Sequence, residues 1–152
     1  MKVYRLSRRK YAKELSGKGA AIVGGRWNSR GTQVIYSAQS RALALAEVAV
    51  HLSLSMLPED FVMVELDLPE SIEIADLDPE NLPKHWNVFP YNRQSQALGD
   101  EFIKASENAV LRVPSAVVQG DFNYLINPGH PHFSKIKITK IGNFPLDNRL
   151  FS

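Results

Sequence analysis

The sequence predicts an α+β domain built around a sheet of short strands. Seven or so short segments alternate apolar and polar residues, as half-buried strands do, whereas few segments have the periodicity of a helix. The chain has 152 residues, of which 44% are hydrophobic and 22% are charged. This is long enough to bury a core and typical of a globular protein. We therefore expect residues 1–152 to form a single domain.

The first half of the chain predicts two strands, two helices and a glycine-rich loop. Alternation in Thr32–Ala38 places Tyr36 on the same face as Val34. The segment that ends at Pro58 is rich in Ala and Leu, which favours a helix. In order, the expected elements are a strand at Lys2–Leu6, a polar helix at Ser7–Leu15, a loop at Gly17–Gly31, a strand at Thr32–Ala38 and a helix at Ala42–Pro58.

The second half is expected to be mostly strands. Phe61–Leu68 gives the clearest pattern, because its apolar residues alternate with Glu65 and Asp67. A proline-punctuated loop, which carries Trp86, either covers a site or caps the core. The other expected elements are a strand at Ser71–Leu77, this loop at Asp78–Pro90, a helix at Ser95–Ser106 with Asp100 toward water, and strands at Val110–Val113, Ala116–Val118, Phe122–Ile126 and Lys135–Ile141.

Glu47 is the first candidate functional residue. It is the only formally charged side chain between Ala42 and Pro58, and at helical spacing it shares a face with the apolar residues Leu43, Ala46, Val50 and Leu54. Burying a carboxylate on such a face without a partner costs on the order of several kcal/mol of folding free energy. We therefore expect Glu47 to meet a cation, hydrogen-bond donors or a ligand.

The glycine-rich loop offers partners for this carboxylate. Glycines bracket Arg26, Trp27 and Asn28, which lets the backbone turn sharply, and the nearest cations in the sequence are Arg26, Arg30 and Arg41. An arginine, the aromatic Tyr36 and Glu47 can thus converge. The ordinary alternatives are that Glu47 is half of a structural ion pair, Tyr36 a core aromatic and Arg26 a solvated charge. The apolar neighbours of Glu47 favour the functional interpretation for that residue.

Composition excludes several classes of protein. There is no cysteine, so disulfides, thiolate nucleophiles and cysteine-bound metals are excluded, and the four histidines show no ligand spacing beyond His130 and His132. We expect no metal. The apolar runs are too short to span a bilayer, and the cationic N-terminus is not followed by the apolar stretch of a secretory signal. We expect a cytoplasmic protein with no membrane contact.

A basic cluster near the N-terminus raises the alternative of a nucleic-acid-binding or RNA-cleaving protein, and its members are Arg8, Arg9, Lys10, Lys13 and Lys18. The lysines of the last predicted strand add to it. Against this alternative stand the formal net charge of only +2 and the lack of a catalytic arrangement of His and Lys. The sequence contains none of the common nucleotide-binding or hydrolase motifs. The segment at Gly17–Ile22 begins like the dinucleotide fingerprint but lacks its third glycine.

Six blocks of the sequence together resemble the RES domain, a family named for an arginine, a glutamate and a serine. The resemblance covers nearly the whole chain, so residues 1–152 are identified as a single RES domain. The blocks are GGRWNSRG (Gly24–Gly31), IYSA (Ile35–Ala38), ALAEVAVH (Ala44–His51), LRVPSAVV (Leu111–Val118), NYLINPGHP (Asn123–Pro131) and LDNRL (Leu146–Leu150).

This resemblance implies a fold, an activity and a partner. The implied fold is an ADP-ribosyltransferase-like core, a split mixed β-sheet flanked by short helices. The implied protein is the toxin of a bacterial type II toxin–antitoxin pair that uses NAD as its substrate, as an NAD glycohydrolase, an NAD phosphorylase or an ADP-ribosyltransferase. The implied partner is an Xre-type helix-turn-helix antitoxin, which we expect to cover the active site and to provide the only link to nucleic acid.

The resemblance also assigns residues. The family arginine falls on Arg26, the glutamate on Glu47 and the serine on Ser115, with Tyr36 as the aromatic and Arg5 as a second arginine. The departures from the family pattern are Gln119 and Gly120, which affect the shape of the loop after the LRVPSAVV block.

Chemistry suggests what these residues would do with NAD. Arginine suits the pyrophosphate, so Arg26 and Arg5 would hold phosphates and ribose, and an aromatic ring would stack on nicotinamide, with Trp27 as a substitute for Tyr36. Glu47 would stabilise an oxocarbenium-like centre. Ser115 would bind the ribose or position the glutamate, although by itself it is an exposed turn hydroxyl. A third possibility is a binding module that has lost turnover.

Overall fold

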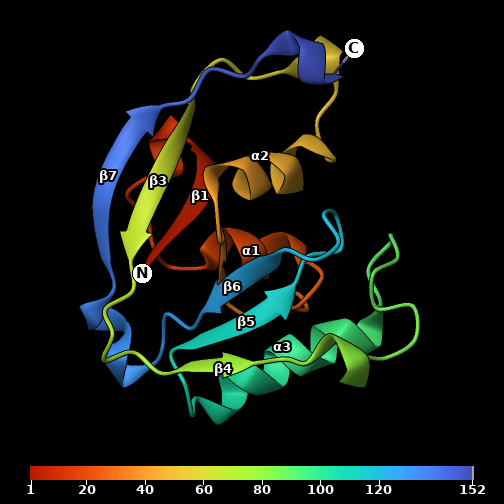
Figure 1. The fold of residues 1–152 in the computed structure, drawn as a ribbon, viewed down its shortest axis with the longest axis vertical. Coiled ribbons are helices and arrows are strands. Elements are labelled where there is room, and N and C mark those ends of the chain that lie inside the picture. Colours follow the sequence, from red (N-terminus) through yellow and green to blue (C-terminus); the bar gives the residue numbers. More distant parts are fainter. Residues whose placement is uncertain (152) are drawn as a thin grey trace.

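The computed structural model describes residues 1–151 and has one sheet of seven strands in the order β4-β5-β6-β2-β1-β3-β7 (Figure 1). Only β4 and β5 pair in parallel, and every other neighbouring pair is antiparallel. The prediction of an α+β fold with a mixed sheet is therefore confirmed. The strands are β1 (Lys2–Arg8), β2 (Ile35–Ala38), β3 (Phe61–Asp67), β4 (Ile74–Asp76), β5 (Val110–Pro114), β6 (Phe122–Ile126) and β7 (Lys137–Asn143).

The described residues contain three α-helices joined by loops and 3-10 turns. The α-helices are α1 (Lys18–Val23), α2 (Arg41–Ala49) and α3 (Arg93–Ala105). None of the helices in residues 1–151 is both long enough and apolar enough to cross a membrane. The 3-10 turns are Arg9–Tyr11, Leu54–Met56, Pro79–Asn81, Pro131–Lys135 and Asn148–Phe151.

The sheet is split between β1 and β2. These two strands pair at a single position, Tyr4 with Ala38, whereas β1 pairs with β3 along its whole length and β2 pairs with β6 along its whole length. The sheet thus has one half made of β1, β3 and β7 and another made of β2, β6, β5 and β4. Figure 1 shows α2 near the junction of the two halves and α3 along the second half. This split is the one that the family resemblance implies.

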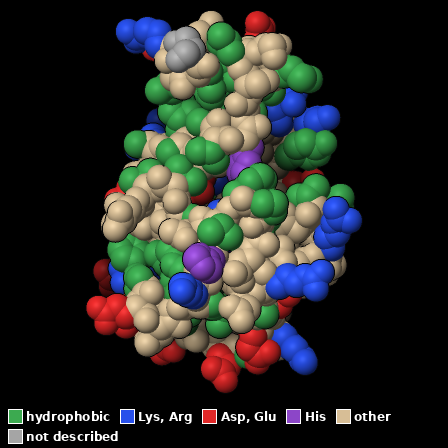
Figure 2. Space-filling view, turned by 90° about the vertical axis from the view of Figure 1, so that its right-hand side faces the viewer, with side chains coloured by type: hydrophobic (Ala, Val, Ile, Leu, Met, Phe, Trp, Pro, Cys, Tyr) green, Lys and Arg blue, Asp and Glu red, His purple; other side chains and the backbone are tan. Residues whose placement is uncertain are grey.

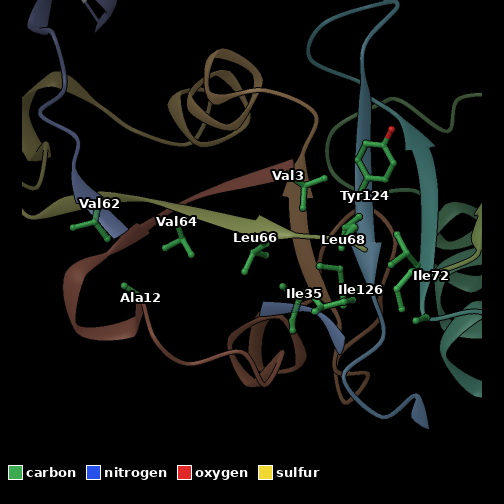
Figure 3. Packing of buried hydrophobic residues seen from close by; sticks show 13 residues of the cluster. Val3, Ala12, Ile35, Val62, Val64, Leu66, Leu68, Ile72, Tyr124 and Ile126 are labelled. Carbon is green, nitrogen blue, oxygen red and sulfur yellow. The ribbon is translucent and has the colours of Figure 1, made fainter. Parts of the chain in front are cut away.

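Three clusters of buried side chains hold the sheet and the helices together. One face of the sheet carries the cluster drawn in Figure 3, in which Val64, Leu66 and Ile126 are fully buried. The other face packs α2 through Leu43 in one cluster and α3 in another. Each buried aliphatic side chain of this size contributes about 1.5–3 kcal/mol to folding. The helix that carries Glu47 is therefore firmly seated at its N-terminal end.

Two predicted elements are wrong in the first third of the chain. The predicted polar helix Ser7–Leu15 is instead the end of β1 and a 3-10 turn at Arg9–Tyr11, because Ser7 and Arg8 pair with β3. The predicted loop Gly17–Gly31 contains the short helix α1. Strand pairing with a distant segment therefore prevails over local helix preference.

Two further predictions are wrong at the ends of elements. The helix that was expected to reach Pro58 ends at Ala49, and Val50 and Leu54, expected on its apolar face, are 58% and 48% exposed. The strand expected at Ala116–Val118 is a turn. The turn forms because the Ser115 side chain binds backbone amides of this segment.

Candidate active site

Glu47 lies at the junction of the two half-sheets because β2 leads directly into α2. Ser40 caps the helix by accepting a hydrogen bond from the Leu43 amide at 3.0 Å. Leu43 is 1% exposed, and Glu47, four residues later on the same side of the helix, is half-buried. The helix therefore holds a carboxylate over the sheet, as the apolar pattern predicts.

The Glu47 carboxylate is satisfied by neutral donors. The Ser115 hydroxyl donates to Oε1 at 2.7 Å, and the Asn123 side-chain amide donates to the same oxygen at 2.6 Å. No Lys, Arg or His within residues 1–151 forms an ion pair with Glu47, and Arg41 pairs with Glu65 instead. Glu47 is therefore not half of a structural ion pair, and its negative charge is not neutralised by a direct partner.

Ser115 follows β5 and is held by its own turn. Its side chain is 4% exposed, and its hydroxyl oxygen accepts hydrogen bonds from the amides of Val117 and Val118 at 3.1 and 3.0 Å. These two bonds replace a strand with a turn and leave the hydroxyl hydrogen to point at Glu47. The interpretation of Ser115 as an exposed turn hydroxyl is therefore wrong.

Asn123 is the site residue that the sequence did not single out. It lies in β6 between Ala38 of β2 and Val113 of β5, on the face of the sheet that α2 covers. Asparagine is unfavourable within strands, so its presence in an inner strand was an available signal. The pairing that brings it to Glu47 is long-range and could not be read from the sequence.

Tyr36 anchors the loop that carries Arg26. Its hydroxyl donates to the Asn28 side chain at 2.6 Å and accepts from the Trp27 amide at 3.1 Å. Asn28 is fully buried and donates to three backbone carbonyls of the loop and α1. A side chain at Gly25 would meet the Tyr36 hydroxyl at 2.7 Å. Burial raises the pKa of Tyr36 above its usual range, so the hydroxyl stays neutral.

Arg26 is half-buried and faces the proline-punctuated loop rather than open solvent. Its Nη1 donates to the carbonyls of Trp86 and Val88, both at 2.9 Å, and its guanidinium carbon lies 5.3 Å from the centre of the Tyr91 ring. Burial lowers the pKa of Arg26, and the charges of Tyr91 and Glu47 act in the opposite direction. The Nη2 and Nε atoms of Arg26 donate to no residue that the structure describes.

Helix α3 also fixes the glycine-rich loop that carries Arg26. The Ser95 hydroxyl donates to the Arg26 carbonyl at 2.8 Å, and the Gln96 side chain donates to the Gly25 carbonyl at 2.9 Å. Asp100 accepts from both the amide and the hydroxyl of Ser29, at 2.9 and 2.5 Å. The prediction that Asp100 points to water is therefore wrong, because this carboxylate tethers the loop.

Trp27 belongs to the core. It is 2% exposed and stacks on Trp86, with ring centres 5.7 Å apart and planes 28° apart. The ring is therefore closed off from a ligand, which removes Trp27 as a substitute for Tyr36. The loop that carries Trp86 both caps the core and covers Arg26.

Arg5 is the one predicted site residue that stands apart. Successive strand residues face opposite sides, so Arg5 lies on the side of Val64, away from its neighbour Tyr4, which packs with the α2 cluster. Its Nη1 donates to the Glu14 carbonyl at 3.4 Å, and it forms no hydrogen bond with Glu47, Tyr36 or Ser115 anywhere in the described chain. Hydrogen bonds join Ser115 to Glu47 and, separately, Tyr36 to the loop that carries Arg26, whereas Arg5 is joined to neither set.

Three of the five cations in the basic cluster near the N-terminus contact side chains of the chain itself. Arg8 forms an ion pair with Asp60, Arg9 donates to the side chain of Asn143, and Lys10 lies 4.9 Å from the centre of the Tyr11 ring. These side chains are not arranged as a bare stripe for a phosphate backbone. The structure therefore gives no support to the nucleic-acid alternative.

The fold and the side chains around Glu47 define an α+β protein with a polar site beside the junction of a split sheet. The sequence profile of the RES domain matches residues 2–147, so the chain belongs to the RES domain family.

Proteins similar to this chain are found in several bacteria. A Sphingobium sp. (strain YBL2) protein, the Prs ADP-ribosylating toxin, is 41% identical over 91% of this chain and 88% of its own length. The Toxin Res of Photorhabdus laumondii is 39% identical over 99% of this chain and 97% of its own length. A chain of the M. tuberculosis MbcT–MbcA toxin–antitoxin complex has the same fold, with a TM-score of 0.74 and 20% identity over 99% of this chain and 86% of that one.

Proposed function

We propose that this protein is a bacterial toxin that cleaves NAD at the bond between nicotinamide and ribose. The observation that carries the proposal is an ionisable carboxylate, Glu47, held by Ser115 and Asn123 without a neutralising cation. The charge of Glu47 also acts on Arg26, the arginine of the glycine-rich loop that Tyr36 anchors. The names of the two relatives, one an ADP-ribosylating toxin and the other Toxin Res, support the same conclusion.

The chemistry needs a negative charge beside the reacting carbon. The bond between C1′ of the ribose and the nicotinamide nitrogen breaks, and its electron pair goes to that nitrogen, which becomes neutral. C1′ then carries the positive charge of an oxocarbenium-like centre, which the Glu47 carboxylate stabilises. The acceptor attacks C1′ and loses its proton. Removing an electrostatic group of this kind typically slows such a step by about 10²–10³-fold.

The remaining residues have roles in binding. Within residues 1–151, Nη2 and Nε of Arg26 make no hydrogen bond, so they would be available for a bidentate contact with the pyrophosphate while Nη1 keeps its bonds to the loop. Tyr36, with its hydroxyl tied to the loop, would present its ring to nicotinamide. Arg5, on the other side of β1, would reach the substrate only after a side-chain movement, so we give it no role in the chemical step.

The acceptor is proposed to be a protein side chain. The name of the Sphingobium relative, which is similar along almost the whole chain, supports transfer of ADP-ribose to a protein. Water and inorganic phosphate use the same bond cleavage and yield ADP-ribose and its 1″-phosphate, respectively. The products therefore distinguish the three acceptors.

We also propose a protein partner, an Xre-type antitoxin that covers the site. A chain of a toxin–antitoxin complex shares the fold, which supports a partner of this kind. Apolar side chains are exposed beside the site at Val50, Leu54 and Phe89, and Phe89 packs against His51. Figure 2 shows apolar side chains across the middle of this side of the molecule. Such exposed apolar surface is suited to a protein interface.

The experiment that tests the function is incubation of the purified protein with NAD, with and without phosphate and with bacterial extract. Free nicotinamide and the ADP-ribose products are followed by chromatography. We expect nicotinamide release by the wild type and loss of at least about 10²-fold in rate for Glu47→Gln, with the fold preserved. Full turnover by Glu47→Gln contradicts the role of Glu47, and no NAD loss under any condition contradicts the activity.

A further inference from the structure

The two hydrogen bonds to Glu47 end on the same oxygen. Ser115 reaches Oε1 from the turn after β5, and Asn123 reaches it from β6. Within residues 1–151 no donor contacts Oε2. The carboxylate is thus held on one side and presents its other oxygen away from both donors.

Asn123 has no other structural task in the described chain. Its backbone is fixed in the ladder between β2 and β5, and its side-chain nitrogen donates to Glu47 alone. The side-chain oxygen accepts no hydrogen bond from residues 1–151. An amide at this strand position therefore serves the carboxylate and not the sheet, which a β-branched residue would stabilise better.

The chemistry of the donor matters as much as its position. A Lys or Arg in place of Asn123 would fix Glu47 equally well but would cancel the negative charge that an oxocarbenium-like centre requires. A neutral amide bound to a carboxylate forms a charge-assisted hydrogen bond and leaves the net charge in place. The Ser115 hydroxyl can rotate about its C–O bond toward another acceptor, whereas the planar amide cannot redirect one hydrogen without moving the whole group.

We propose that Asn123 is a positioning residue for the reaction, which holds Oε1 of Glu47 so that the ionised Oε2 faces the reacting ribose. This inference rests on the proposed function and extends it to a residue outside the arginine, glutamate and serine for which the family is named. Asn123 acts through Glu47 and does not itself touch the reacting atoms.

Three variants test the proposal through nicotinamide release over a range of pH. Asn123→Ala removes the donor, and Asn123→Asp replaces it with a group that donates only when protonated. Asn127→Ala is the matched control, because Asn127 is an asparagine that directly follows β6 and is even more buried than Asn123, but it donates to Ile103 and Ser106. All three are compared at equal concentrations of folded protein.

We expect Asn123→Ala to lower kcat and kcat/KM together by roughly 10-fold or more, with KM nearly unchanged, because a hydrogen bond to a charged group is lost. Asn123→Asp should work only while the two carboxyl groups share a proton, so its activity falls at alkaline pH where that of the wild type does not. Asn127→Ala should retain the rate and pH profile of the wild type. An unchanged kcat in Asn123→Ala, or a wild-type pH profile in Asn123→Asp, overturns the proposal.

The positioning itself can be tested without turnover. If the wild type releases no nicotinamide, the proposed function fails, and crystal structures of Asn123→Ala and Asn127→Ala then decide the inference. We expect the Glu47 carboxylate to leave its present orientation in the first variant and to keep it in the second. An unmoved carboxylate in Asn123→Ala overturns the role of Asn123.

Discussion

The hydroxyl of Tyr36 lies between the Trp27 amide and the Asn28 side chain, and through them it fixes the part of the loop that directly follows Arg26. The residue thus has two separable parts, a ring that packs against the buried cluster containing Val34 and a hydroxyl that holds the loop. The hydroxyl is coupled to the position of Arg26, because Trp27 is the next residue in the chain.

Tyr36→Phe keeps the ring and removes this anchor. We expect the free energy of unfolding to fall by roughly 1–3 kcal/mol, because a buried amide and a buried side-chain oxygen lose their partner. KM for NAD should rise because Arg26 is less well fixed, and urea unfolding and steady-state kinetics measure the two effects. Tyr4→Phe, on a neighbouring strand, is the control. A Tyr36→Phe protein with wild-type stability and KM would show that the hydroxyl does not hold the loop.

Gly99 gives α3 its close contact with the loop. A Cβ at this position would lie 1.6 Å from the Trp27 carbonyl oxygen, so the backbones of helix and loop could not keep their distance. We expect Gly99→Ala to lower the free energy of unfolding by at least about 3 kcal/mol. Gly19→Ala is the matched control, since a Cβ there meets nothing and alanine favours the helix α1 by up to about 1 kcal/mol. Equal stability of the two variants would contradict this contact.

The sequence predicted the parts of the site that follow from local pattern. A single carboxylate among apolar residues predicted a half-buried Glu47, and alternation placed Tyr36 with Val34. The family resemblance added Ser115, which the structure brings to the same carboxylate. Helical periodicity shows which residues share a face but not what covers it, and this is why Val50 and Leu54 are exposed against expectation.

The predictions that were wrong or missing depend on contacts between segments that are distant in the sequence. The charged segment after Leu6 looked like a helix, but pairing of Arg8 with Phe61 extends β1 instead. Asn123 and Glu47 are brought together by the pairing of β6 with β2 and by the packing of α2, neither of which leaves a short-range pattern. The sequence therefore indicated Glu47 but not Asn123, the neutral donor that the fold brings to it.

Arg26 is expected to act on the phosphates and not on the reacting carbon. Arg26→Lys keeps the charge but loses the planar fork, so KM for NAD should rise by about 10-fold while kcat changes less. Arg30→Lys, in the same loop but exposed, should leave both constants unchanged. Initial rates over a range of NAD concentrations separate the two constants. A fall in kcat at constant KM would instead place Arg26 at the transition state.

The rival interpretation of a nucleic-acid-binding toxin makes an opposite prediction. Because Arg8 and Arg9 already have protein partners, we expect no binding of RNA or DNA that weakens steeply with salt. Gel-shift titrations of the purified chain at low and high salt measure this. Retardation at low salt that disappears in Lys10→Ala and Lys13→Ala would favour the rival function.

Ser115 and Asn123 should behave as one unit because both donate to Oε1 of Glu47. Once either donor is removed, the carboxylate can already turn away, so removing the second should cost less than it does in the wild type. We expect the loss in log kcat for the Ser115→Ala, Asn123→Ala double variant to be smaller than the sum of the single losses. The difference should correspond to a coupling of about 0.5–3 kcal/mol. Ser115→Ala also frees the amides of Val117 and Val118, so the rates are compared per folded molecule, with folding measured by circular dichroism. Strictly additive losses would mean that the two donors act on different features of the site, and that the shared oxygen is not what couples them to catalysis.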